Sequence, residues 1–293
     1  MQRKRLTSEE KEENIMRKDK EMKRKKKRIL VIGIAIILIL AILGGGFCAY
    51  RFYKHERKQN AQIQELSGEI TLLKEKEKNV DVEWSDDGYN YLAIGNSITL
   101  HDYADYWWDD DRGMASSEDS KDYVHLVESY LKTNSKDVTM NAVNLASWET
   151  NGNDRAEFLQ LADPYLYEGL DLITIQLGEN ASNLDTWESD FEQLISYIKK
   201  KCPKAQIIVV GDFWSNGNRD RDKEAAANAK GVTYVSLDGI KDNKDYYAGL
   251  GTTVEGKKGD MHTIEHDGVA NHPGDKGMAA IAERITTKID LSK

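Results

Sequence analysis

The chain has 293 residues, 40% of them hydrophobic, and a formal net charge of −9 at pH 7. This length is enough for one substantial domain with appended segments. The charge is unevenly divided: residues 1–28 hold thirteen Lys or Arg against six Asp or Glu, a net of +7, so the remainder carries −16. An acidic domain repels polyanions, which excludes nucleic acid as an expected partner.

An uncharged apolar run, ILVIGIAIILILAILGGGFCAY, occupies residues 29–50. As a helix it would span about 30 Å, the thickness of a bilayer's hydrocarbon core. A cleaved signal peptide is the alternative, but its apolar run is shorter and ends at a small-residue cleavage site. The basic cluster at 23–28 precedes the run, and positive flanks stay in the cytoplasm. We therefore expect a cytoplasmic tail (1–28), a transmembrane signal anchor (29–50) and an extracellular C-terminal domain at the cell membrane.

Residues 51–79 predict a helical stalk between this anchor and the domain. Its apolar residues alternate spacings of three and four, as a coiled-coil seam does: Ile63, Leu66, Ile70 and Leu73. The seam covers only two heptads, and Gly68 interrupts it. A solvated spacer is therefore favoured over a coil that makes the protein a dimer.

From residue 80 to 293, short apolar runs alternate with amphipathic stretches. The runs are rich in Val and Ile and bounded by Gly, Asn or Asp, as strands buried on both faces are. The expected strands are 91–95, 140–146, 170–178, 205–213 and 232–237. The expected helices are 120–133, 153–162, 185–201, 219–229 and 274–289. This alternation predicts a three-layer α/β/α domain around a parallel five-stranded sheet.

In such open sheets the functional site forms at the carboxyl ends of the strands. Ser97 follows the first expected strand in Gly-Asn-Ser-Ile-Thr, and Asn180 follows the third in Gly-Glu-Asn. The segment 144–150 follows the second strand, and His272 precedes the last helix. Each residue alone is commonly a turn or cap residue. Together they supply the nucleophile, base and oxyanion donor that acyl transfer requires.

Three of these motifs resemble the conserved blocks of the SGNH, or GDSL-type, hydrolase family, and the resemblance covers residues 88–290. The block Gly-Asp-Ser-Leu is similar to residues 95–98, and Gly-x-Asn-Asp is similar to residues 178–181. The block Asp-x-x-His-Pro is similar to the stretch from Asp267 to Pro273. The resemblance implies a flavodoxin-like fold and, with the anchor, a membrane-bound bacterial member.

The same resemblance assigns roles to individual residues. It implies that Ser97 is the nucleophile, that His272 is the general base, and that no cofactor is needed. The oxyanion hole would combine Asn180 with the backbone amide of Ser97 and an amide of the second block, for which we take Glu149 from the candidates 146–149.

The chain departs from the family pattern at three positions. Asn96 replaces the usual Asp, the second block lacks its usual Gly, and Val269 stands three residues before His272, where the family has Asp. Asp267 lies five residues before His272. Either Asp267 completes a catalytic triad, which is our choice, or the site is a Ser–His dyad whose imidazole is oriented by a backbone carbonyl.

The segment 101–118, just after the nucleophile, holds two Trp and two Tyr among several carboxylates. Aromatic faces beside polar groups suit sugar rings, so Trp107 and Trp108 are expected to bind substrate; a packed lid is the alternative. The expected function is a cell-surface serine esterase that hydrolyses O-acyl esters, O-acetyl groups on carbohydrate above all. An O-acyltransferase acting on envelope glycan and a non-catalytic surface binding module are the alternatives.

His262 and His266 are four residues apart, a spacing at which two histidines on a helix can share a metal ion. The surrounding sequence, MHTIEHDGVANHPG, is glycine-rich and loop-like. We therefore expect no metal.

Overall fold

The structure is a computed structural model. It describes residues 22, 50–51, 53–60, 62–63, 66–74, 82–134, 137–152 and 154–292. The predicted tail apart from residue 22, and the predicted transmembrane helix apart from its last residue, lie outside these residues. Among the helices that are described, none is long and apolar enough to cross a membrane.

Contacts between Cα atoms divide the chain into two units, Met1–Ser67 and Gly68–Lys293. The described residues from 50 to 67 are helical, as the predicted stalk requires, and its dimerisation stays a prediction. In the second unit the helical residues 68–74 place Leu72, only 8% exposed, in the hydrophobic core. The compact unit therefore begins before residue 80, where the sequence pattern placed the domain boundary.

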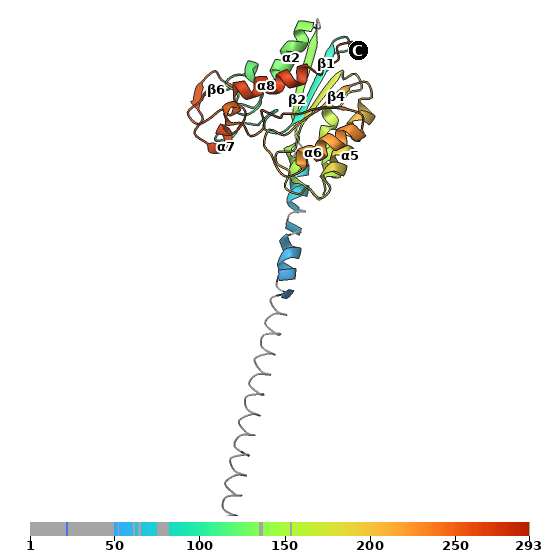
Figure 1. Cartoon of the computed structure of the whole chain (residues 1–293), viewed down its shortest axis with the longest axis vertical. Helices are drawn as coiled ribbons and strands as arrows, with labels where there is room; N and C mark the ends of the chain where they lie inside the picture. Colours follow the sequence, from blue (N-terminus) through green and yellow to red (C-terminus); the bar gives the residue numbers. More distant parts are fainter. Residues whose placement is uncertain are drawn as a thin grey trace, which may run out of the picture. The chain divides into compact units, whose positions relative to one another are not determined.

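The second unit has the predicted three-layer fold (Figure 1). Its five parallel strands lie in the order β2-β1-β3-β4-β5. They are β1 (Tyr89–Gly95), β2 (Val138–Asn144), β3 (Leu172–Gln176), β4 (Gln206–Val210) and β5 (Thr233–Val235). In this register Gly95 at the end of β1 pairs with Asn144 on one side and with Gln176 on the other. The segments that follow these three strands therefore leave the same edge of the sheet side by side.

Helices cover both faces of the sheet. On one face α2 (Tyr123–Asn134) packs on α8 (Asp275–Thr286), and on the other α5 (Trp187–Lys201) packs on α6 (Arg219–Ala229). Alternate strand residues serve the two faces, because successive side chains of a strand point in opposite directions.

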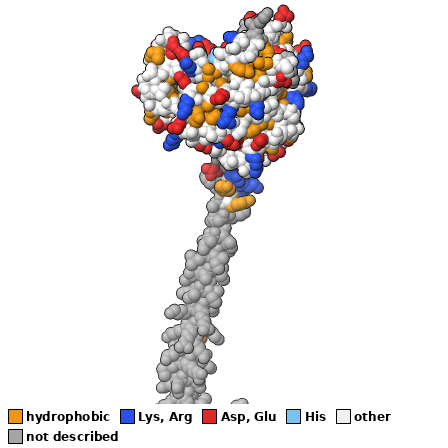
Figure 2. All heavy atoms as spheres, turned by 45° about the horizontal axis from the view of Figure 1, so that its top comes forward, with side chains coloured by type: hydrophobic (Ala, Val, Ile, Leu, Met, Phe, Trp, Pro, Cys, Tyr) orange, Lys and Arg blue, Asp and Glu red, His pale blue; other side chains and the backbone are white. Residues whose placement is uncertain are grey.

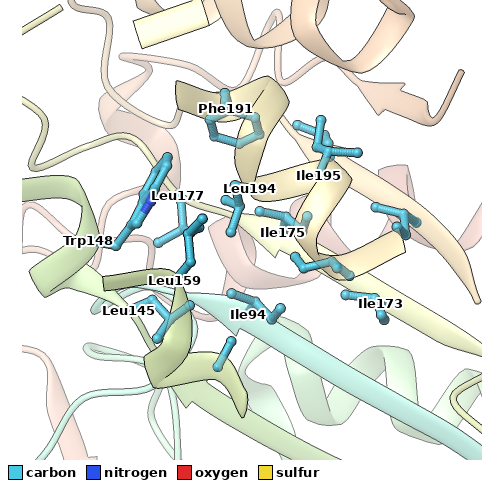
Figure 3. Packing of buried hydrophobic residues seen from close by; sticks show 14 of the residues in the cluster. Ile94, Leu145, Trp148, Leu159, Ile173, Ile175, Leu177, Phe191, Leu194 and Ile195 are labelled. Atoms are coloured by element: carbon cyan, nitrogen blue, oxygen red, sulfur yellow. The ribbon is translucent and has the colours of Figure 1, made fainter. Parts of the chain in front are cut away.

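The two cores show this alternation within β1. Leu92 and Ile94 belong to the α5 core, whereas Tyr91 and Ala93 belong to the α2–α8 core. Figure 3 shows the first core, where Ile94 and its neighbours on β3 lie beneath the side chains of α5. Burial on both faces is what the near-continuous apolar runs of the sequence predict.

The expected helix 153–162 is present as α4 (Arg155–Phe158) followed directly by the 3-10 helix η2 (Leu159–Tyr165). Several short elements were not predicted from the sequence. They are the helices α3 (Ala146–Thr150) and α7 (Asp267–Ala270), the 3-10 helices η1 (Asp119–Lys121) and η3 (Lys244–Tyr246), and the antiparallel pair β6 (Thr253–Glu255) and β7 (Met261–Thr263). A separate small core joins the segment after Ser97 to the pair β6–β7 and to α7. Its buried members are Trp107, Met114, Ala115, Val254, Ile264, Val269 and Ala270.

The surface of the second unit carries mixed charge. Figure 2 shows acidic and basic side chains interspersed over one face. Ion pairs on the helices include Lys132 with Glu128 at 2.8 Å and Lys230 with Glu192 at 2.9 Å. The excess of acidic residues is therefore not gathered into a single patch on the face shown.

A buried ion cluster joins the loops after β3 and β4. Asp212 is fully buried and contacts Arg219 Nε at 2.6 Å and Lys223 Nζ at 2.7 Å. The two cations also donate to main-chain carbonyls: Arg219 to those of Glu179 and Trp214, and Lys223 to that of Leu177. One interior carboxylate thereby holds two loops at the edge where the strands end.

Replacing this carboxylate tests the cluster. Asp212→Ala leaves two cations buried without their anion, so we expect the free energy of unfolding to fall by about 3–5 kcal/mol. Chemical denaturation measures the change. The control is Lys132→Ala, which removes a half-exposed pair on α2 worth about 0.3–0.5 kcal/mol. Equal small losses in both variants would show that the cluster does not hold the edge.

Candidate active site

Ser97 and His272, which are 175 residues apart in the chain, meet at this edge. Ser97 follows β1 directly, and its Oγ lies 2.8 Å from His272 Nε2. The turn depends on Gly95, because a Cβ there would lie 1.8 Å from Thr99 Oγ1 and 2.8 Å from the carbonyl oxygen of Gln176. His272 stands between α7 and α8, where its carbonyl accepts the N–H of Ala248 at 2.9 Å. The sheet and the loop before α8 together bring the two side chains into contact.

A main-chain carbonyl orients the imidazole. His272 Nδ1 lies 2.7 Å from the carbonyl oxygen of Gly268, which can only accept a hydrogen bond. The neutral ring therefore carries its proton on Nδ1 and presents the lone pair of Nε2 to the Ser97 hydroxyl. This is the tautomer that a general base needs.

The expectation that Asp267 completes a triad is wrong. Asp267 is exposed at the first position of α7, and the Nδ1 contact goes to the carbonyl of the next residue. The reason lies in α7 itself: this helical turn, not predicted from the sequence, brings the carbonyl of Gly268 back to a residue four positions later. The alternative of a Ser–His dyad with a carbonyl partner describes the observed geometry.

The environment of His272 favours its neutral form. Burial lowers the pKa of His272 to about 4; the hydrogen bond to Gly268 opposes this shift, and the nearby His101 adds to it. The ring of Trp214 packs edge-on against the imidazole, with centroids 5.0 Å apart. At neutral pH the ring is unprotonated and able to accept a proton.

Asn180 is held by a buried carboxylate. Its Nδ2 lies 2.5 Å from Glu149 Oε2, and its backbone nitrogen lies 3.3 Å from the same oxygen. An amide nitrogen carries two hydrogens, so the contact with Glu149 leaves one for another acceptor. Glu149 is fully buried in α3 and also accepts the backbone N–H of Gly178.

Glu149 was expected to contribute a backbone donor to the oxyanion hole. The structure brings its side chain into the site instead, as an acceptor, and a carboxylate cannot donate to an oxyanion. The donor roles of the Glu149 and Ser97 backbone amides and of the second Asn180 hydrogen stay predictions.

Asn96 links this carboxylate to the nucleophile. Its Nδ2 donates to Glu149 Oε1 at 2.9 Å and to Glu179 Oε2 at 2.8 Å, while its Oδ1 accepts the N–H of Ile98 at 3.1 Å. A chain of contacts therefore runs from Asn180 through Glu149 and Asn96 to the residue before Ser97. An Asp at 96 would place a third carboxylate against two others, which explains why Asn stands where the family pattern has Asp.

The aromatic residues after the nucleophile are not arranged as expected. Trp107 is fully buried in the small core beneath the guanidinium of Arg112, so the expectation that it binds substrate is wrong. Hydrophobic packing of this segment, the lid alternative, explains its burial. Trp108 is half-buried and stacks on His262 with centroids 4.3 Å apart; its role in binding stays a prediction.

The aromatic side chains that are well exposed on this segment are Tyr103 (64%) and Tyr106 (41%). Tyr106 stacks on His266 with centroids 4.8 Å apart. The sequence did not distinguish these tyrosines from the tryptophans, because the exposure of each ring depends on how the segment 101–118 folds.

Within the described residues, the one group of acidic or histidine side chains close enough to share a metal ion is Asp109, Asp110 and Asp111. Arg112 pairs with Asp109, and Lys257 pairs with the other two. Each of these carboxylates is therefore already paired with a cation of the chain.

The bridging amide provides a stability test. Asn96→Asp buries a third acidic group, so we expect the free energy of unfolding at pH 8 to fall by about 3 kcal/mol. The deficit should shrink at lower pH, because protonation removes the added charge. Asn216→Asp, on an exposed loop, is the matched control and should change stability by less than about 0.5 kcal/mol. Chemical denaturation at several pH values decides, and a pH-independent deficit would contradict the charge explanation.

No family model and no curated protein matches this chain. Similar solved structures include an extracellular lipase from Streptomyces rimosus (15% identity, TM-score 0.44, covering 69% of this chain and 100% of that one). A second is a two-domain esterase active on acetylated mannans (16% identity, TM-score 0.46, covering 68% of this chain and 48% of that one). A third is a putative GDSL-like lipase from Bacteroides ovatus (14% identity, TM-score 0.43, covering 68% of this chain and 97% of that one). The evidence for activity is the geometry of the site.

Proposed function

We propose that this protein is a serine ester hydrolase. The observation that carries the proposal is the contact of 2.8 Å between Ser97 Oγ and His272 Nε2, with Nδ1 fixed by the Gly268 carbonyl. A hydroxyl, a neutral imidazole and a carbonyl in this order are the parts of an activated nucleophile.

In the proposed reaction His272 takes the proton of Ser97 while the hydroxyl oxygen attacks the ester carbonyl. Asn180 and main-chain amides stabilise the oxyanion, the alcohol leaves with the proton from His272, and water then hydrolyses the acyl-serine. General-base assistance contributes about 10²–10⁴ in rate, and each oxyanion donor contributes about 10²–10³.

The proposed substrates are O-acetyl esters of carbohydrates at the cell surface. Two features support this class: the predicted membrane anchor, and the exposed rings of Tyr103 and Tyr106 on the segment that follows the nucleophile. Aromatic faces beside carboxylates suit a sugar ring. A transferase would pass the acetyl group to a second sugar, and a binding module would leave the ester intact.

Loss of the nucleophile tests the activity. Ser97→Ala should abolish hydrolysis of acetyl esters, and Asn180→Ala should lower kcat by about 10²–10³. Acetate release from O-acetylated glycans, and release of the corresponding acid from acetyl, butyryl and longer esters, measures both. A serine-reactive phosphonate should label the wild-type chain at Ser97. An unlabelled chain would favour the binding module, and activity confined to long acyl esters would reject the carbohydrate class.

The role of the Gly268 carbonyl predicts that the exposed carboxylate beside it is dispensable. Asp267→Asn should leave kcat within about threefold of wild type, whereas loss of an orienting triad Asp costs about 10⁴. His272→Ala is the control for a lost base. Steady-state kinetics with an acetyl ester would contradict the dyad if Asp267→Asn approached the inactivity of His272→Ala.

A further inference from the structure

Glu149 has no place in the mechanism above, yet it is the most highly connected side chain of the site. We propose that Glu149 is a positioning residue that aims the Asn180 amide at the oxyanion, and that it does so only as a carboxylate. The oxyanion hole is then assembled by ionisation of Glu149 and dismantled by its protonation. This inference rests on the proposed ester hydrolysis and adds to it a pH-dependent control of the same site.

The first argument is geometric. Within the part of the chain that the structure describes, every partner of the Glu149 carboxylate is a donor: the Gly178 N–H and the Asn96 amide at Oε1, and the backbone and side-chain nitrogens of Asn180 at Oε2. A carboxylate offers about four acceptor positions, which is the number these donors use. Protonation of either oxygen would set a hydrogen against one of the donors. Of the two contacts on Oε2, the one from the Asn180 side-chain amide is the shorter, at 2.5 Å against 3.3 Å, and it fixes the direction of the remaining amide hydrogen.

The second argument is that Asn180 needs such a partner. Asn180 is exposed, so water competes for its amide, and an exposed side chain loses rotamer freedom when it is fixed. Its partner Glu149 is fully buried and cannot move away. A rigid interior acceptor gives the mobile surface amide one preferred direction, as preorganisation of an oxyanion donor requires.

The charges around Glu149 come from three sides. Glu179, on the loop after β3, shares the Asn96 amide with it. Arg155, from α4, donates to the main-chain carbonyl of Glu149 at 3.2 Å and is itself paired with Asp190 of α5 at 2.7 Å. Arg219, from α6, donates to the carbonyl of Glu179 and is paired with Asp212. Glu149 therefore faces one acidic neighbour directly, and each nearby cation already has its own carboxylate.

These surroundings move its titration into the neutral range. Burial and the charge of Glu179 raise the pKa of Glu149 to about 7, against the opposing effect of the donors from Gly178, Asn96 and Asn180. The pKa of His272 is lowered to about 4. The carboxylate fraction of Glu149 rises with pH through about 7, whereas the imidazole is already neutral there. Two separate steps in activity follow.

The test is the pH dependence of kcat for the full-length protein with an acetyl ester. In the wild type, kcat should fall by about tenfold or more between pH 8.5 and pH 5.5 as the oxyanion donor is lost, and fall again through about pH 4 as His272 is protonated. Glu149→Gln should have the low kcat at every pH, with KM little changed. It should lack the step near pH 7 and keep the step near pH 4.

A double-mutant cycle separates positioning from folding. If Glu149 acts through Asn180, Glu149→Gln should cost little more than about threefold in an Asn180→Ala background. Glu179→Gln, which removes the neighbouring charge, should move the upper step to lower pH. This variant also keeps the test decisive if Glu149→Gln fails to fold.

The outcomes distinguish the two proposals. A wild-type chain without Ser97-dependent hydrolysis would reject the proposed function. A wild-type enzyme with a single acid step near pH 4, or with Glu149→Gln and Asn180→Ala effects that multiply independently, would overturn the role of Glu149 and leave the hydrolase intact.

Discussion

The positions of the loops at the carboxyl ends of the strands depend on carboxylates buried in the interior. Asp212 neutralises two buried cations, and those cations hold the carbonyls of the loops after β3 and β4. Buried charge is costly unless it is paired and hydrogen-bonded. The positions of the loops are therefore set by the need to satisfy these groups, and the reactive side chains take their places from the loops.

The requirement that buried charge be hydrogen-bonded also sets the positions of the acidic side chains nearer the nucleophile. Two acidic side chains, Glu149 and Glu179, approach one another because the amide of Asn96 donates to both. This arrangement fixes the residue before the nucleophile and the loop that carries Asn180. It also fixes the start of the loop after β4, where the backbone N–H of Phe213 donates to the Glu179 carboxylate at 2.9 Å. Ser97 itself is held through its carbonyl, which accepts the N–H of Met114 at 2.8 Å.

Much of this could be read from the sequence because it depends on local pattern. The apolar runs predicted all five strands of the sheet, and α6 spans the residues 219–229 that were expected. The rule that sites lie at strand ends brought out Ser97, Asn180 and His272, of which the structure brings Ser97 and His272 into contact. These features follow from side-chain periodicity and from chain topology, and both are encoded over a few neighbouring residues.

The remaining features depend on contacts between distant segments. The four-residue helix α7 has no periodicity to detect, and without it the carbonyl partner of His272 could not be located. The burial of Trp107 depends on the β6–β7 pair some 150 residues later, whose strands are three residues each. The acceptor role of Glu149 depends on donors from two other segments, the turn after β1 and the loop after β3. Composition alone gave no reason to prefer the side chain of Glu149 over its backbone.

The group that orients His272 belongs to the main chain, and this has a consequence for how such sites evolve. A point substitution can delete a carboxylate, but every amino acid carries the same carbonyl. The orientation of the base is therefore insensitive to the identity of residue 268 so long as its backbone keeps its path, and it is vulnerable instead to insertions and deletions between residues 267 and 272. A search for a third catalytic side chain would pass over enzymes built in this way, although their chemistry is intact.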